Sequence, residues 1–272
     1  MNSDIVEFFA KYIEKQLGIV YSESNFFQLH YRLVEIAKQN GLPSVDALYE
    51  RAKAQGIEGA IKALLLDVAT NNETSFFRDQ SVFRMFIEKC VPEISKRPGA
   101  GKLRVWSAAS SSGQEVYSLL MEYDQALQKD AQMLPIEMVA TDVSSSILER
   151  AKAGRYSQLE VQRGLPARYL IRYFDKIGED RWEVRSFLKD RVQFQKLNLL
   201  HDFSSLGQFD IVFCRNVLIY QSVESKKDII DRISHLLQPG GFLVLGAAES
   251  LFGLSDKFNQ VEFNGAIGYQ KK

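Results

Sequence analysis

The sequence predicts an α/β fold, in which an all-α N-terminal domain precedes a Rossmann-like sheet with a small antiparallel β insertion. Three observations lead to this prediction. Residues 1–70 show only the apolar spacing of amphipathic helices, with no strand pattern between them. From about residue 102, short apolar segments alternate with amphipathic helices, which is typical of a mainly parallel sheet covered on both faces. Residues 173–191 interrupt that alternation with apolar side chains set among charges, which predicts a small β-hairpin.

The predicted helical domain contains four helices with recognisable starts and stops. In the first, residues 4–17, apolar side chains recur every three or four positions and so define one buried face. Ser3 is the expected N-cap of this helix, and Gly18 is expected to end it. The other helices are expected at about residues 23–40, 44–56 and 58–69. We therefore place a helical domain at residues 1–70, and a linker with the sheet domain at residues 71–272.

The sheet domain is predicted to contain five strands that alternate with helices, followed by a hairpin. Amphipathic helices are expected at residues 115–127 and 223–237. The hairpin pairs residues 260–263 with 267–270 around Asn264-Gly265, a favoured two-residue turn. The five strands are expected at residues 103–106, 136–140, 192–195, 211–213 and 242–245.

Composition excludes several classes of protein. The 272 residues carry a formal net charge of +0, so no bulk basic field gathers nucleic acid. Two cysteines are too few for a disulfide scaffold or a cysteine-rich zinc site, and we predict no metal. No apolar run reaches the roughly 18 residues of a membrane span, and the N-terminus lacks the basic start of a signal peptide. These features predict a cytoplasmic protein without direct membrane insertion.

Ligands of open parallel sheets bind beyond the carboxyl ends of the strands, and two strand ends here suit an adenosine group. Small residues at 107–113 allow close approach of a ligand to a helix N-terminus, although an ordinary tight turn explains them equally well. Asp142 at the second strand end can accept hydrogen bonds from ribose hydroxyls or can cap the helix that follows. The GxGxxG fingerprint is missing, which disfavours a nicotinamide cofactor.

Two further segments carry polar groups that core packing does not explain. Arg215, Asn216 and Tyr220 follow the fourth strand, although a lone tyrosine is often structural. Residues 71–79 lie between the two domains and combine small polar side chains with Phe76 and Phe77. This segment is predicted either to cover the site or to be a linker that its phenylalanines anchor to the core.

The chain resembles the CheR family of chemotaxis methyltransferases over nearly its whole length. The resemblance rests on an ordered set of segments: NETSFFR at 72–78, LRVWSAA at 103–109, ATDV at 140–143, FDIVFCRNVLIY at 209–220, LQPGG at 237–241, and Glu249-Ser250. It implies a class I methyltransferase sheet and S-adenosylmethionine as cofactor, with S-adenosylhomocysteine as product. The implied reaction is methyl esterification of glutamate side chains on the cytoplasmic domain of bacterial chemoreceptors.

The resemblance also implies roles for individual residues. Arg78 and Tyr220 are the expected catalytic residues, with Tyr220 facing the transferring methyl group. Asp142 is expected on the ribose and Glu115 on other polar groups of the cofactor. Arg215 and Asn216 are expected at the methionine end. The remaining expected cofactor contacts are Asn72 and Thr74, which with Arg78 touch the cofactor or the acceptor region, and Asn198 and Leu199 beside the adenine.

The sequence departs from the family pattern at two places. The family commonly has Thr-Gly-Glu-Glu-Pro after the first strand, whereas residues 112–116 read Ser-Gly-Gln-Glu-Val here. The family's second helix usually carries a basic face for docking the receptor, and only His30, Arg32 and Lys38 are available for it here. In some members the β insertion binds a tether peptide at the receptor's C-terminus, which is a second expected contact. The alternatives are a different methyl acceptor, or a binding module without catalysis.

Overall fold

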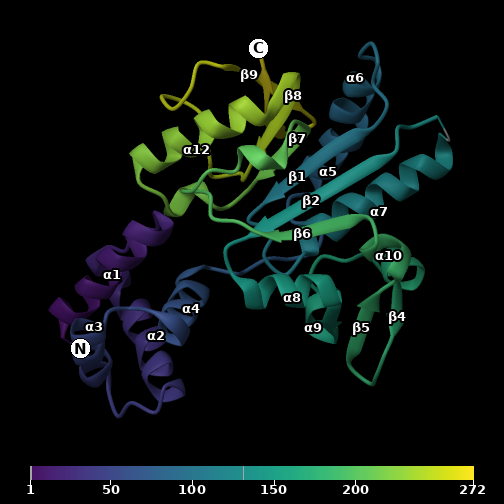
Figure 1. Ribbon diagram of the computed structural model, residues 1–272. Helices are drawn as coiled ribbons and strands as arrows, with labels where there is room; N and C mark the ends of the chain where they lie inside the picture. Colours follow the sequence, from purple (N-terminus) through teal and green to yellow (C-terminus); the bar gives the residue numbers. More distant parts are fainter. Residues whose placement is uncertain (1, 131) are drawn as a thin grey trace.

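The computed structural model describes residues 2–130 and 132–272 (Figure 1). Its N-terminal part is helical, and the predicted helices are present. The first begins one residue earlier than predicted, because the side chain of Asn2, not that of Ser3, accepts the cap hydrogen bond from Asp4. Gly18 ends this helix with a φ of 70°. The helices are α1 (Ser3–Leu17), η1 (Glu23–Asn25), α2 (Phe26–Gln39), α3 (Val45–Gln55) and α4 (Gly59–Ala69). The four α-helices share one hydrophobic core.

Helix α2 does not present the expected basic face. Arg32 turns inward and donates to the Tyr21 hydroxyl at 2.9 Å and to the Ala69 carbonyl at 3.3 Å. His30 is half-buried, so Lys38 is the one of these three side chains that is exposed. The outer surface carries Phe27 and Tyr31 instead, each 65% exposed. Burial of the other α2 face against α1 and α4 decides this orientation.

The remainder of the chain forms a seven-stranded sheet that confirms the predicted α/β fold. Strands β6, β2, β1, β7 and β8 are parallel to one another, and the C-terminal hairpin β9–β10 joins β8 in antiparallel fashion at one edge. The strand order is β6-β2-β1-β7-β8-β10-β9. Their bounds are β1 Leu103–Ala108, β2 Ile136–Asp142, β6 Val192–Lys196, β7 Phe209–Cys214, β8 Leu237–Leu245, β9 Phe258–Phe263 and β10 Ala266–Lys271.

Two core layers cover the faces of this sheet. Val105 and Trp106 are neighbours on β1 and point to opposite faces, so each belongs to a different layer. The Val105 layer includes residues of α5, α6 and α7, and the Trp106 layer includes residues of α12. The helices of this part are α5 Gln80–Met85, η2 Phe86–Cys90, α6 Val91–Ser95, α7 Gln114–Lys129, α8 Ser145–Ala153, α9 Gln158–Gln162, α10 Ala167–Tyr173, α11 Ser186–Lys189 and α12 Val223–Leu236, with short turns η3 Ser204–Leu206 and η4 Leu218–Tyr220.

The chain between β2 and β6 forms a small antiparallel sheet, which lies below the main sheet in Figure 1. Its hairpin, β4 (Phe174–Lys176) and β5 (Arg181–Val184), lies where the sequence predicted one. A third strand, β3 (Arg155–Ser157), pairs with β5 and was not predicted. Three residues are too short for a periodic signal, and only pairing with β5 defines this strand.

The direction in which successive strands are added to the sheet reverses at β1. The chain proceeds outward from β1 to β2 and β6, then crosses back to place β7 on the other side of β1. The carboxyl ends of β1, β2, β6 and β7 therefore meet at one edge of the sheet, where ligands of this architecture bind. Within the described residues, no helix combines the length and the apolar character needed to cross a membrane.

Candidate functional site

A cavity opens at this edge of the sheet, and its space, including open solvent at the mouth, is about 1030 Å³. Its wall is formed by the segments that follow β1, β2, β6 and β7, by residues 70–78 of the interdomain linker, and by Leu17 and Ile19 from the end of α1. All ten residues predicted for the site line this one cavity: Asn72, Thr74, Arg78, Glu115, Asp142, Asn198, Leu199, Arg215, Asn216 and Tyr220. The parallel topology accounts for the seven that end or follow strands, because it collects the strand ends at a single edge, and the linker brings Asn72, Thr74 and Arg78 to the same edge.

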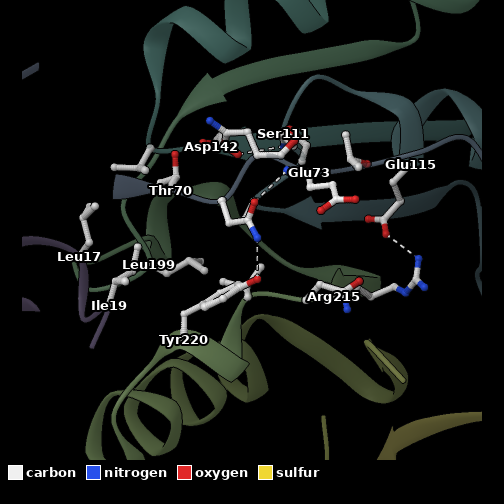
Figure 2. A pocket seen from close by; sticks show the side chains of 18 of the residues that line it. Leu17, Ile19, Thr70, Glu73, Ser111, Glu115, Asp142, Leu199, Arg215 and Tyr220 are labelled. Atoms are coloured by element: carbon white, nitrogen blue, oxygen red, sulfur yellow. Dashed lines mark hydrogen bonds and ion pairs between the residues drawn. The ribbon is translucent and has the colours of Figure 1, made fainter. Parts of the chain in front are cut away.

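Asp142 places a buried carboxylate at the tip of β2 (Figure 2). Its Oδ1 accepts from the Ser144 amide at 3.0 Å, and its Oδ2 accepts from the Ser111 amide at 2.9 Å. Burial raises the pKa of Asp142, and the amides of Ser144 and Ser111 partly offset that rise. The alternative that Asp142 caps the following helix is wrong, because the side chain of Ser144 accepts from Ile147 and caps α8.

Arg215 forms the centre of a buried ion network at the other end of the cavity, shown at the right of Figure 2. Its side chain is 2% exposed; Nη1 donates to Glu115 at 3.0 Å, and Nη2 donates to Asp79 and to the Arg78 carbonyl. Ser107 donates to the other oxygen of Glu115 at 2.8 Å. The Arg215 Nε is also buried and has no hydrogen-bond partner among the described residues. Arg215 thus joins β7 to the linker and to α7.

Tyr220 closes the cavity from the side of η4. Its hydroxyl accepts a hydrogen bond from Asn71 Nδ2 at 2.9 Å, and its carbonyl accepts from the Val20 amide at 2.9 Å. The tyrosine is therefore held by the linker and by the segment that leaves α1. Asn71 belongs to the polar stretch that the sequence singled out, but nothing in its residue type indicated this pairing.

The wall beside α1 is largely apolar, with Leu17, Ile19 and Leu199 shown together in Figure 2. Asn198 also lines this wall, but its side chain is hydrogen-bonded to backbone groups. Its Nδ2 donates to the Gln16 carbonyl at 2.7 Å, and its Oδ1 accepts from the Leu200 amide at 3.0 Å. Asn198 therefore ties the sheet domain to α1, and the apolar side chains form the surface that a flat ring system could contact.

Unusual backbone conformations concentrate around the cavity. In the described part of the chain, six residues other than glycine have a positive φ; three of them line the cavity, and two more lie in the linker segment beside it. Such conformations are unfavourable for residues with a side chain and tend to cluster at ligand sites, where surrounding structure imposes them. The five are Phe77, Asp79, Ala109, Ser111 and Asn216; the sixth, Asn264, is in the turn between β9 and β10.

Four residues of the site were missed in the sequence. Ser111 and Asp79 contact predicted residues, but a serine in a loop and an aspartate before a helix are common. Asn71 donates a hydrogen bond to the Tyr220 hydroxyl, and Glu249 binds the backbone of the segment that precedes Tyr220. Glu249 belongs to one of the segments that carry the family resemblance, but the sequence did not indicate which groups it contacts. No group of three or more His, Cys, Asp or Glu side chains suited to a metal occurs among residues 2–130 and 132–272.

Comparison with known proteins gives matches over the whole chain. The profile of the family described as "CheR methyltransferase, SAM binding domain" matches residues 72–267. The chain is 43% identical to chemotaxis protein methyltransferase 1 of Pseudomonas aeruginosa, covering 100% of this chain and 98% of that protein. It is 42% identical to chemotaxis protein methyltransferase Cher2 of Pseudomonas putida, covering 98% and 97%. Because coverage is nearly complete, the helical residues 1–70 have counterparts in these relatives as well.

Proposed function

The chain belongs to the CheR methyltransferase family, and on that premise we propose that it methylates glutamate side chains of chemoreceptors. Its cofactor is S-adenosylmethionine, and its role is methyl transfer in chemotaxis. The acceptor, the roles of individual residues and the partner contacts described below belong to the proposal. The observation that carries the proposal is the order of chemical groups along one cavity.

That order matches the parts of S-adenosylmethionine. The apolar wall of Leu17, Ile19 and Leu199 suits the adenine, and the neighbouring Asp142 carboxylate suits the ribose hydroxyls. Arg78 and the buried Nε of Arg215 supply donors for a carboxylate at the opposite end. We assign Asn72, Thr74, Glu115, Asn198 and Asn216 to the surrounding cofactor contacts.

The reaction needs positioning more than it needs a base. When bound, S-adenosylmethionine supplies a sulfonium methyl group, which a glutamate oxygen accepts as the carbon–sulfur bond breaks to give the methyl ester and S-adenosylhomocysteine. A glutamate with a pKa near 4.3 is already ionised at pH 7, so no strong base has to remove a proton. Tyr220 orients the acceptor, Arg78 holds a carboxylate, and the linker and α1 exclude water.

We propose that residues 1–70 form the receptor-docking domain and that residues 71–272 form the linker and methyltransferase domain. The separate core of α1–α4 supports this division. The outer strands β3 and β4 of the small sheet offer main-chain groups to a receptor tether by strand addition. The receptor's cytoplasmic domain is the proposed partner, which places the reaction in the cytoplasm.

The test is methyl transfer from radiolabelled S-adenosylmethionine to purified cytoplasmic fragments of chemoreceptors from the same organism. We expect label that is released by mild base, as from a carboxyl methyl ester, and that is lost when the receptor glutamates are replaced by alanine. Calorimetric titration with S-adenosylhomocysteine, with NAD as the control, establishes the cofactor site separately. Saturable binding of S-adenosylhomocysteine without transfer to any receptor fragment contradicts the proposed acceptor.

A further inference from the structure

Glu249 lies in a tight turn directly after β8, at the same edge of the sheet as the cavity. The Glu249 amide donates to the Gly246 carbonyl at 2.9 Å, which closes the turn and returns the glutamate side chain toward the end of β7. Glu249 is part of a motif that the sequence singled out, yet it is not among the residues lining the cavity. Its function is therefore not explained by contact with the cofactor.

The carboxylate of Glu249 accepts four backbone hydrogen bonds. Its Oε1 accepts from the amides of Val217 at 2.9 Å and Ile219 at 3.1 Å. Its Oε2 accepts from the amides of Asn216 at 2.8 Å and Gly246 at 2.7 Å. Three of these donors lie in the segment that joins Arg215 to Tyr220. Among the described residues, no Lys or Arg forms an ion pair with Glu249, and its carboxylate contacts are these backbone amides.

The packing around these bonds leaves no space for a side chain at position 246. A Cβ atom at Gly246 would lie 2.7 Å from Asn216 Nδ2, 2.8 Å from the Asn216 amide nitrogen and 2.8 Å from Glu249 Oε2. Asn216 itself has a φ of 59°, an unfavourable value that asparagine tolerates better than most residues. The close approach of two loops thus imposes one particular backbone path on the residues before Tyr220.

We propose that Glu249 is a positioning residue for methyl transfer, which holds the Asn216–Ile219 backbone so that Tyr220 is fixed at the cavity. This inference rests on the proposed function, because it concerns the same site. The contacts that hold Tyr220 from the other side come from Asn71 and Val20. Glu249 holds the segment from the side of the sheet, because it binds the backbone amides of the residues that directly follow β7.

The test compares Glu249→Gln with a matched control, Asp210→Asn. Asp210 is at the opposite end of β7, where its carboxylate accepts from the Arg104 amide at 2.9 Å and from Arg97 at 3.1 Å. Both variants replace one carboxylate oxygen by an NH₂ group, which cannot accept from an amide. We measure single-turnover methyl transfer to the receptor fragment, calorimetric affinity for S-adenosylhomocysteine, thermal unfolding, and hydrogen–deuterium exchange of peptides spanning residues 215–221.

For Glu249→Gln we expect faster exchange in residues 215–221 and a roughly 10- to 100-fold slower transfer step, the size of effect that small misplacement of a reacting group produces. Affinity for S-adenosylhomocysteine falls less than the transfer rate, because Asn216 is the one proposed cofactor contact that Glu249 holds, and Asp142 and the apolar wall are untouched. Asp210→Asn lowers the unfolding temperature but leaves the transfer rate and this exchange unchanged. Gly246→Ala keeps the carboxylate yet blocks the close approach, so it gives the same pattern as Glu249→Gln and serves if that variant folds poorly.

Two results overturn the inference. One is wild-type exchange in residues 215–221 of Glu249→Gln, and the other is a transfer rate that falls no more than in Asp210→Asn. If wild-type protein methylates no receptor fragment, the proposed acceptor fails. The exchange measurement still decides then whether Glu249 holds the segment.

Discussion

Asp142 is 5% exposed, and burial and backbone hydrogen bonds shift the pKa of its carboxyl group in opposite directions. Burial dominates and raises the pKa of the carboxyl, because removal from water disfavours the charged form. An acid whose pKa is raised in the folded state contributes stability below its ordinary pKa, and this contribution is lost as the pH rises through the raised value. Burial therefore disfavours the charged form of this carboxyl group, and hydrogen bonds from the hydroxyl donors of a ribose would favour it.

This electrostatic situation predicts that affinity for S-adenosylhomocysteine falls on acidification, at a pH above the usual range of an aspartate. The neutral acid loses one acceptor oxygen, whereas the carboxylate has acceptor oxygens for both ribose hydroxyls in the proposed binding mode. Asp142→Asn binds roughly 10- to 100-fold more weakly, since a hydrogen bond to a charged group contributes about 1.5–3 kcal/mol. Its affinity also lacks this acid dependence. Calorimetry over a pH series checks both points, and an unchanged acid dependence in Asp142→Asn contradicts the assignment.

Tyr220 is predicted to act on the rate of methyl transfer more than on cofactor binding. Tyr220→Phe removes the hydroxyl that accepts from Asn71 and that we propose to orient the acceptor, so we expect single-turnover transfer to slow about 10-fold or more. The matched control is Tyr123→Phe, whose hydroxyl donates to the Leu134 carbonyl away from the cavity. Equal losses of transfer rate and of S-adenosylhomocysteine affinity in Tyr220→Phe exclude the proposed role.

At the scale of elements, the small sheet and its flanking helices support the linker that borders the cavity. The Phe76 ring packs edge-on against Tyr156 on β3 and Phe174 on β4, with centroids 4.9 and 5.6 Å away. The ring centroids of Phe77 and of Tyr169 on α10 are 4.8 Å apart. Both phenylalanines are buried, so the linker is anchored to the core as one of the two sequence interpretations predicted. The same segment also covers the cavity with Thr74 and Arg78, so both interpretations are correct.

Gly164, between α9 and α10, provides a test of this support. It has a φ of 92°, and a Cβ there would lie 2.1 Å from the Phe76 carbonyl oxygen. Gly164→Ala therefore displaces the linker and is expected to reduce stability by at least about 1–2 kcal/mol, the cost of a left-handed conformation. Affinity for S-adenosylhomocysteine falls with it. Gly178→Ala in the β4–β5 turn has open space around it and serves as the control, measured by denaturant unfolding and calorimetry. Unchanged affinity in Gly164→Ala would show that the linker is positioned independently of the small sheet.

At the scale of the whole molecule, the helical and sheet parts complete one cavity together. The carbonyl of Gln16 binds Asn198, and Val20 binds the carbonyl of Tyr220. Gly18 packs so closely on Gln221 that a Cβ would lie 2.1 Å from its side-chain oxygen. The proposed docking domain is thus also a wall of the proposed catalytic site. The residues of the helical part that contact the Tyr220 segment are those at and just after the end of α1.

Local pattern determined the helices, the strands and the residues at the strand ends. Apolar periodicity reports which face of each element is buried, and a parallel sheet gathers strand ends at one edge. Together these were sufficient to predict the α/β fold and a site at that edge, and the CheR resemblance supplied the cofactor and the full set of ten residues.

Only the tertiary structure decided which of these residues contact one another. The carboxylate of Glu249 binds amides about 30 positions earlier in the chain, and Arg215 pairs with Asp79 and Glu115 from two other elements. Likewise, Arg32 turned inward and β3 joined the small sheet through contacts between distant segments. Periodicity describes the burial of a segment, whereas such pairings depend on how the packed elements bring distant backbone and charged groups together.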